Sequence, residues 1–213
     1  MYDAVIFDLD GTLIDSESIG ITAGITAFGR HGYPVTVDLF HSMVGVDQPT
    51  GETMLRAALG ADLPLARIKA DWQALTRAAY HDQGVPLRPG AAEVLELLGK
   101  AGHRLAVATS SRREPAEWKL ERAGLRHHFA TVVSYDCITR PKPAPDPFLE
   151  AARRLGAAPA RCVAFEDSET GAASARAAGM TVVQVPDQVA TEGRHATLVA
   201  ADLLSGARAL GLI

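Results

Sequence analysis

Five short apolar runs constrain the fold of this 213-residue chain more than any other feature of its sequence. Each run holds four or five residues, and each contains valine. Such runs are typical of strands that are covered on both faces, as in a parallel sheet. The runs are residues 4–7, 105–108, 131–134, 162–165 and 181–185.

Helix-like segments alternate with these runs along the second half of the chain. They cover residues 91–102, 114–125, 145–156 and 170–179. Each has a glycine at or next to its end, which is typical of the position that follows the last helical turn. Two of them carry proline near the start, where a helix tolerates it. The alternation predicts an α/β fold, a doubly wound parallel sheet with helices on both faces.

One long region breaks the alternation, because residues 16–86 hold no convincing strand. An apolar stripe with helical spacing runs through its first part, and residues 49–60 and 64–81 also form helix-like patterns. We therefore predict two domains. An α-helical domain over residues 16–86 is inserted after the first strand, and residues 1–15 and 87–213 form the α/β core.

Composition narrows the class of protein. Hydrophobic residues make up 47% of the chain, charged residues 22%, and the net charge is −4, which is ordinary for a soluble globular protein. Without a basic stripe we expect no nucleic-acid partner. Without an apolar run near 18 residues or a signal peptide we expect no membrane partner and a cytoplasmic location. The two cysteines, Cys137 and Cys162, lack CxxC spacing and are interpreted as free thiols.

Two carboxylates follow the first apolar run. Asp8 comes directly after it and Asp10 two positions later, ahead of Gly11. In an open α/β sheet, ligands bind at the carboxyl ends of the strands. Like charges this close raise each other's pKa, and a hard cation such as Mg²⁺ removes that cost. The alternative is a simple turn, which Asp and Gly also favour.

Polar residues follow three other predicted elements. Thr109 and Ser110 come after the second run, where a hydroxyl and free N–H groups can hold phosphate or cap a helix. Lys142 stands between two prolines, which restrict its backbone, so it is either a fixed cation or a solvated loop residue. Glu166 and Asp167 follow the fourth run as further metal ligands or as helix caps.

The four motifs together resemble those of the haloacid dehalogenase superfamily. They are DLDGT (8–12), ATSS (108–111), KPAPD (142–146) and FEDS (165–168). The pattern looks most similar to the branch that holds sugar phosphatases, phosphoglycolate phosphatases and β-phosphoglucomutase. This resemblance implies a Rossmann-like core with strand order 5-4-1-2-3 and a small α-helical cap inserted after the first motif.

The resemblance also implies roles for the motif residues. Asp8 would be the nucleophile that forms an aspartyl-phosphate. Asp10 would protonate the leaving oxygen and later take a proton from water. Thr109 and Lys142 would hold the phosphoryl oxygens, helped by the backbone N–H of Ser110.

A Mg²⁺ ion is implied as the cofactor. Its ligands would be Asp8, the backbone carbonyl of Asp10 and Asp167, with Glu166 close by. The expected function is a Mg²⁺-dependent phosphatase for a small-molecule phosphate ester, a phosphorylated sugar or sugar acid. We expect a monomer or a weak homodimer.

Two departures separate this chain from other branches. Mutases of the resembling branch carry a cap histidine where Gly20 stands here, which argues against the alternative of a sugar phosphomutase. Dehalogenases lack an acid at the position of Asp10, and an acid there is useful when an alkoxide leaves. A third alternative, a non-enzymatic phosphate-binding module, would usually have lost one of the acids.

Substrate choice is expected to lie in the cap. The candidate specificity loop is residues 43–51, in which Gly45, Asp47, Gln48 and Thr50 would meet a polar substrate. The alternative is an ordinary connection between two helices.

Overall fold

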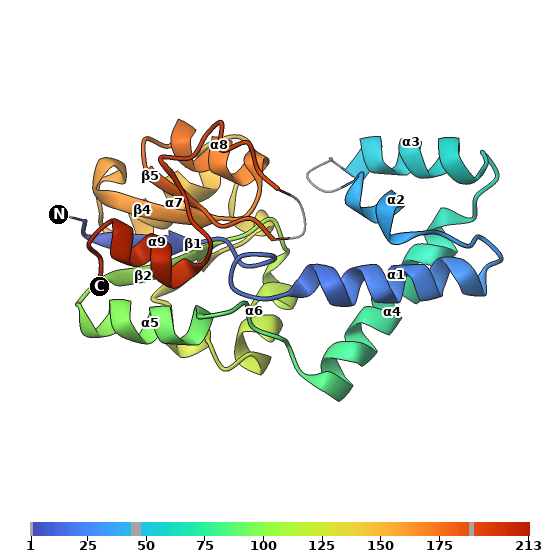
Figure 1. Cartoon of the computed structure of the whole chain (residues 1–213), viewed down its shortest axis with the longest axis horizontal. Helices are drawn as coiled ribbons and strands as arrows, with labels where there is room; N and C mark the ends of the chain where they lie inside the picture. Colours follow the sequence, from blue (N-terminus) through green and yellow to red (C-terminus); the bar gives the residue numbers. More distant parts are fainter. Residues whose placement is uncertain (1, 44–47, 188–189) are drawn as a thin grey trace. The chain divides into compact units, whose positions relative to one another are not determined.

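The computed structural model describes residues 2–43, 48–187 and 190–213. Contacts between residues divide the chain into two compact units, one formed by Met1–Asp15 with Val85–Ile213 and one by Ser16–Gly84 (Figure 1). Within the described residues, no helix is both long enough and apolar enough to cross a membrane.

The first unit is built on a six-stranded sheet with the order β3-β2-β1-β4-β5-β6, and every pair of neighbours is parallel. The strands are β1 (Ala4–Phe7), β2 (Arg104–Ala108), β3 (Thr131–Val133), β4 (Cys162–Glu166), β5 (Thr181–Gln184) and β6 (Leu198–Val199). The predicted fold class and the order of the first five strands are confirmed. The sixth strand corrects the predicted order, which had five strands. It was missed because a strand of two residues leaves no apolar run in the sequence.

Helices cover both faces of this sheet (Figure 1). They are α5 (Ala91–Lys100), α6 (Arg113–Arg122), α7 (Asp146–Leu155), α8 (Glu169–Ala177) and α9 (Leu203–Ala209), with short 3₁₀ turns η1 (Arg126–His128), η2 (Tyr135–Cys137) and η3 (Pro159–Arg161). Helices α7 and α8 pack on the face that carries Ile6 and Ala164. Helix α9 lies on the other face, where Gly206 approaches Phe165 and Val183.

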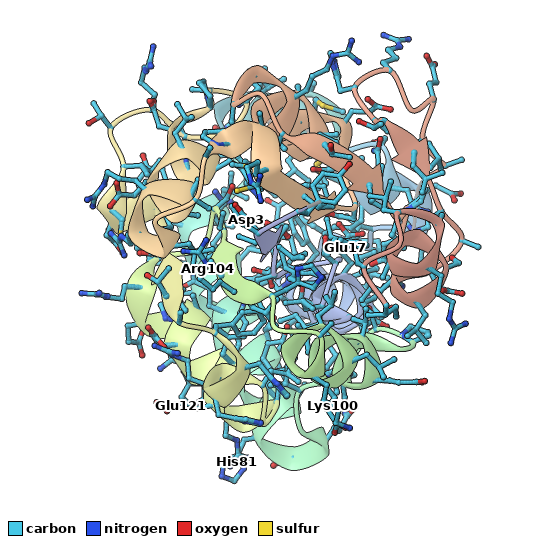
Figure 2. All side chains as sticks on the ribbon, turned by 90° about the vertical axis from the view of Figure 1, so that its left-hand side faces the viewer. Asp3, Glu17, His81, Lys100, Arg104 and Glu121 are labelled. Atoms are coloured by element: carbon cyan, nitrogen blue, oxygen red, sulfur yellow. The ribbon has the colours of Figure 1, made fainter. Side chains whose placement is uncertain are left out.

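Strand β1 lies at the centre of the sheet, and its four residues are fully buried. Its last residue, Phe7, is in register with Val107 of β2 and Phe165 of β4. Parallel neighbours in register end at the same edge, so the residues that follow β1, β2 and β4 are brought together there. At the opposite edge the strands begin among charged side chains, including Asp3 and Arg104 (Figure 2).

All regular secondary structure in the described residues of the second unit is helical. It contains α1 (Ser16–Arg30), α2 (Val37–His41), α3 (Gln48–Leu59) and α4 (Leu65–Gln83). Three aromatic rings form its centre: Phe28, Phe40 and Trp72 lie edge to face, with centroids 5.2 to 6.2 Å apart. The indole Nε1 of Trp72 donates a hydrogen bond to the carbonyl oxygen of Gly20 at 2.7 Å. This bond ties α4 to α1.

The chain leaves and re-enters the first unit through a short antiparallel pairing. Ile14 forms an isolated antiparallel bridge with Leu87. On either side of it, the Asp15 N–H donates to the carbonyl of Pro86 and the Arg88 N–H donates to the carbonyl of Leu13, both at 2.9 Å. The two ends of the inserted segment are therefore fastened to each other at the edge of the core.

Candidate active site

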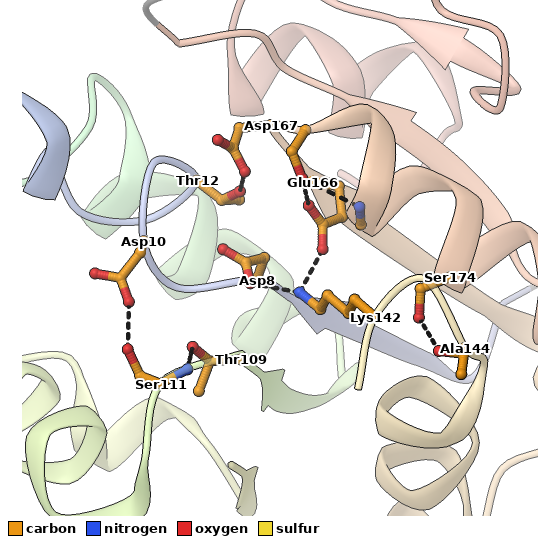
Figure 3. Close-up of polar contacts among 12 residues, drawn as sticks. Asp8, Asp10, Thr12, Thr109, Ser111, Lys142, Ala144, Glu166, Asp167 and Ser174 are labelled. Atoms are coloured by element: carbon orange, nitrogen blue, oxygen red, sulfur yellow. Dashed lines mark hydrogen bonds and ion pairs between the residues drawn. The ribbon is translucent and has the colours of Figure 1, made fainter. Parts of the chain in front are cut away.

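A buried lysine between two carboxylates forms the centre of the site (Figure 3). The Lys142 Nζ lies 2.5 Å from Asp8 Oδ1 and 2.5 Å from Glu166 Oε1. The exposed fractions of the three side chains are only 6%, 9% and 1%. The lysine also lies over the ring of Phe148, 5.1 Å from its centroid. The ammonium is thus held almost out of water and is neutralised by the two acids.

The loop before α7 places Lys142 in this position. Its backbone is fixed by the hydroxyl of Ser174, which donates to the carbonyl of Ala144 at 2.5 Å. An ion pair closes the base of the loop, with the Arg140 Nε 2.8 Å from an Asp146 carboxylate oxygen. These contacts hold Lys142 as a fixed cation rather than as a solvated loop residue, and its role toward a phosphoryl group stays a prediction.

The electrostatics of the cluster follow from its burial. Burial raises the pKa of Asp8 to about 7, and the Lys142 charge opposes this change. Burial acts to lower the pKa of Lys142, but the charges of Asp8 and Glu166 outweigh it, so that pKa is raised. Burial, together with the charges of Glu166 and Asp8, raises the pKa of Asp167 to about 9. Fully ionised, the carboxylates of the cluster would carry more negative charge than Lys142 alone can compensate, and Asp8 and Asp167 therefore hold protons more tightly than free aspartates do.

The donor set fits a hard divalent cation. Asp8, Glu166 and Asp167 each offer a carboxylate oxygen, and these oxygens lie within 4.8 Å of one another. Such all-oxygen sets suit Mg²⁺, and an added cation would counter the burial and the repulsion that raise the pKa values of Asp8 and Asp167. The Thr12 hydroxyl orients Asp167 by donating to its Oδ1 at 3.3 Å. Gly11 leaves room for this carboxylate, since a Cβ there would lie 2.9 Å from the Asp167 Cγ.

Both carboxylate oxygens of Glu166 accept hydrogen bonds. Lys142 binds Oε1, and the Ser168 hydroxyl donates to Oε2 at 3.2 Å. Ser168 is also the N-cap of α8 and accepts from the N–H of Gly171 at 3.1 Å. A Cβ on Gly171 would overlap the Glu166 carboxylate. A glycine in the first turn of α8 therefore lets the helix approach the buried acid.

Thr109 lies at the end of β2 and is 2% exposed. Its N–H donates to the carbonyl of Val133 at 2.9 Å, and its Oγ1 accepts the backbone N–H of Ser111 at 3.0 Å. The predicted phosphate-binding hydroxyl therefore also shapes the turn after the strand. Ser110, the other predicted residue in this turn, is exposed.

Asp10 makes contacts that were not predicted. Its carboxylate accepts a hydrogen bond from the Ser111 hydroxyl at 2.7 Å (Figure 3). It also accepts one from the Lys119 Nζ at 2.6 Å. Ser111 belongs to a recognised motif, but no role was assigned to it. Lys119 lies inside α6, where the sequence offers no signal that separates it from an ordinary surface lysine.

The predicted specificity loop lies largely outside the described residues. Gly45 and Asp47 lie beyond the described residues, and Gln48 begins α3 with a side chain that is likewise not described. Thr50 is an exposed residue of α3. The roles of these four residues stay predictions.

The chain thus combines a parallel sheet with an acid cluster and a buried lysine at the carboxyl ends of its strands, and an aspartate follows the first strand directly. Residues 2–179 match the family model described as haloacid dehalogenase-like hydrolase. The chain belongs to this family, as the sequence motifs predicted.

Several named relatives in the family are phosphatases. The chain is 34% identical over 184 residues to the fructose-1-phosphate phosphatase YqaB of Escherichia coli, covering 86% of this chain and 96% of that protein. It is 32% identical over 178 residues to a phosphorylated carbohydrates phosphatase of Thermotoga maritima, covering 84% and 82%. It is also 34% identical to protein SUPPRESSOR OF QUENCHING 1, chloroplastic, of Arabidopsis thaliana, but spans only 18% of that protein.

Solved structures agree with this assignment. A HAD family hydrolase from Deinococcus radiodurans with bound phosphate and sodium superimposes with a TM-score of 0.83 at 30% identity, covering 100% of this chain and 97% of that chain. A putative beta-phosphoglucomutase from Thermotoga maritima gives a TM-score of 0.81 at 29% identity, covering 98% and 99%. The predicted family and enzyme class, a phosphoric monoester hydrolase, are confirmed.

Proposed function

We propose that this protein is a Mg²⁺-dependent phosphatase that hydrolyses a small phosphorylated sugar or sugar acid through an aspartyl-phosphate. The observation that carries the proposal is the Lys142 ammonium, 2.5 Å from Asp8 and buried beside Glu166 and Asp167. This arrangement provides a carboxylate nucleophile next to fixed positive charge, which phosphoryl transfer requires.

In the first step, an Asp8 carboxylate oxygen attacks the phosphorus of the ester. The bond between phosphorus and the ester oxygen breaks, and that oxygen takes the electron pair. Asp10 gives its proton to this oxygen, so the sugar leaves as a neutral alcohol. Lys142 offsets the charge on the phosphoryl oxygens, and the Thr109 hydroxyl donates a hydrogen bond to one of them.

In the second step, a water oxygen attacks the phosphorus of the aspartyl-phosphate. Asp10, now ionised, takes a proton from the water. The bond between phosphorus and the Asp8 oxygen breaks, which regenerates the Asp8 carboxylate and releases inorganic phosphate. The covalent intermediate divides one difficult hydrolysis into two easier displacements.

The metal would be held by the Asp8 carboxylate, the Asp10 backbone carbonyl and Asp167, with Glu166 close by. Bound there, Mg²⁺ supplies positive charge that stabilises the transferring phosphoryl group. Thr12 supports this assignment, because it holds the Asp167 carboxylate in a set orientation.

The proposed substrate class rests on the relatives named as phosphatases of fructose 1-phosphate and of phosphorylated carbohydrates. We assign the unit Ser16–Gly84 as the cap domain that selects among such esters. A sugar phosphomutase is the second candidate, favoured by the likeness to a putative beta-phosphoglucomutase. Against it stands Gly20, which offers no side chain where the mutases carry a histidine.

The test is a panel of phosphate esters that includes fructose 1-phosphate, glucose 1-phosphate, glucose 6-phosphate and phosphoglycolate. Phosphate release is measured with Mg²⁺ and with EDTA, for the wild type and for Asp8→Asn. We expect release only with Mg²⁺ and only by the wild type. If Asp8→Asn releases phosphate as fast as the wild type, the assignment of Asp8 as the nucleophile is refuted. Conversion of glucose 1-phosphate to glucose 6-phosphate without phosphate release would favour the mutase.

A further inference from the structure

The acid-base residue of the proposed reaction is held by two side chains to which the motifs give no role. Asp10 Oδ1 accepts from the Lys119 Nζ at 2.6 Å, and Asp10 Oδ2 accepts from the Ser111 hydroxyl at 2.7 Å. The Lys119 Nζ also lies 3.4 Å from the Ser111 oxygen, which closes the group into a triangle. Each oxygen of the carboxylate therefore has its own donor.

Both donors come from rigid parts of the core unit. The Ser111 N–H donates to Thr109 Oγ1 at 3.0 Å, and the Ser111 carbonyl accepts from the Tyr135 N–H at 3.0 Å. Lys119 belongs to α6, next to the fully buried Leu120, and its own side chain is 14% exposed. A lysine that is mostly removed from water keeps a partner, because a lone buried ammonium is costly.

The Asp10 side chain is less buried than that of Lys119. Asp10 follows β1 in a loop, and its side chain is 30% exposed. An aspartate side chain rotates about two torsions, and a proton donor works only within hydrogen-bonding reach of the oxygen that it serves. Two donors on the two oxygens select one orientation of this carboxyl.

We propose that Lys119 and Ser111 are positioning residues that hold the Asp10 carboxyl in the orientation required for proton transfer. The proposal rests on the proposed function and names residues that act through Asp10 without touching the substrate. The proposal also links the phosphate site to the acid-base residue. Ser111 bonds the Thr109 hydroxyl through its N–H and the Asp10 carboxylate through its hydroxyl, and Lys119 follows on the next helix.

A substrate whose leaving group needs no proton can distinguish this positioning role from a general loss of structure. With p-nitrophenyl phosphate, the phenolate departs readily without an acid, so the first step does not depend on Asp10. The second step still depends on it, because water must lose a proton when it attacks the aspartyl-phosphate. A variant that only disorients Asp10 should therefore slow the second step and spare the first.

The experiment uses single turnovers of p-nitrophenyl phosphate with the full-length protein in excess and with Mg²⁺. Release of p-nitrophenol reports the first step, and release of inorganic phosphate after acid quench reports the second. For Lys119→Met we expect phosphate release to slow by about 10- to 100-fold, part of the factor that general acid-base catalysis supplies. We expect p-nitrophenol release to stay within about 3-fold of the wild type.

Three further variants complete the design. Lys119→Arg keeps a donor and a charge and should recover most of the phosphate release. Ser111→Ala removes the other donor and should reproduce the defect if Lys119→Met does not fold. Lys100→Met is the matched control, because this lysine ends α5 with a side chain that is 73% exposed (Figure 2).

Two results would overturn the positioning role. One is an unchanged rate of phosphate release in both Lys119→Met and Ser111→Ala. The other is an equal loss in both steps, which indicates a general structural defect. Failure of the proposed function looks different: the wild type would release no p-nitrophenol, or Asp8→Asn would release it at the wild-type rate. Either of those results overturns both proposals together.

Discussion

Replacing Lys142 by methionine should cost more stability than any other single lysine substitution in the core unit. Methionine has a similar length and keeps the contact with the ring of Phe148, so little packing is lost. The charge is lost completely. Asp8 and Glu166, whose side chains are 9% and 1% exposed, would then face each other without a cation between them.

The expected loss follows from this geometry. Removing one partner of a buried ion pair costs about 3–5 kcal/mol, because the remaining charge is left uncompensated. For a protein of this size, 1 kcal/mol corresponds to a shift in Tm of about 2–4 °C. We therefore expect the Tm of Lys142→Met to fall by roughly 6–20 °C at pH 7 without metal.

The loss should also depend on pH in a defined direction. In the variant, no Lys142 charge opposes the burial that raises the pKa of Asp8, so the folded state binds a proton at this carboxylate more tightly than the unfolded chain does. Stability then rises as the pH falls, by about 1.4 kcal/mol per pH unit for each proton taken up. The deficit at pH 7 should therefore shrink at pH 5.

Thermal unfolding followed by circular dichroism in EDTA at both pH values tests this reasoning. Lys100→Met serves as the control and should change the free energy of unfolding by less than about 0.5 kcal/mol, as exposed pairs do. A deficit for Lys142→Met below about 1 kcal/mol at pH 7 would refute the argument. A deficit that is as large at pH 5 as at pH 7 would refute it as well.

Two further predictions concern the same cluster. Gly171→Ala should destabilise the protein by about 1–3 kcal/mol and lower kcat, because the new Cβ displaces Glu166 from Lys142. Urea unfolding measures the loss of stability. Gly99→Ala is the matched control, because a Cβ there meets nothing within 4 Å. The raised pKa of Asp167, about 9 in the folded protein, means that wild-type stability in EDTA should fall as the pH rises from 5 to 9. Asp167→Asn should flatten this dependence in Tm measurements and reduce the stabilisation by Mg²⁺ at pH 9, and an unchanged slope would contradict the assignment.

The strands of the core were predictable because each is buried on both faces. Strand β1 spans Ala4–Phe7, the predicted residues, and the other four predicted strands differ from the observed ones by one residue at an end. Strand β6 was not predictable in this way. It forms through contacts distant in sequence, such as the bond from the Thr197 N–H to the carbonyl of Val182, which leave no local pattern.

The site, like the sheet, has parts that could be predicted from the sequence and parts that could not. Asp8 and Asp167 follow adjacent strands of the sheet, so the fold alone brings them to one edge. The choice of partners did not follow from the motifs. Glu166 pairs with Lys142, and Asp10 pairs with Lys119, because of where a loop and a helix are packed, and neither position is encoded in the spacing of the motif residues.

The antiparallel pairing between Leu13–Asp15 and Pro86–Arg88 has a consequence for how this family diversifies. Every strand in the described part of the chain lies outside the insertion, β1 before it and β2 to β6 after it. The backbone bonds that close the insertion point come from residues of the core itself. The intervening segment can therefore be shortened, lengthened or exchanged during evolution while Asp8 keeps its place directly after β1. A designer could use the same junction to graft a foreign helical segment onto an unchanged reaction centre, altering selectivity and chemistry independently.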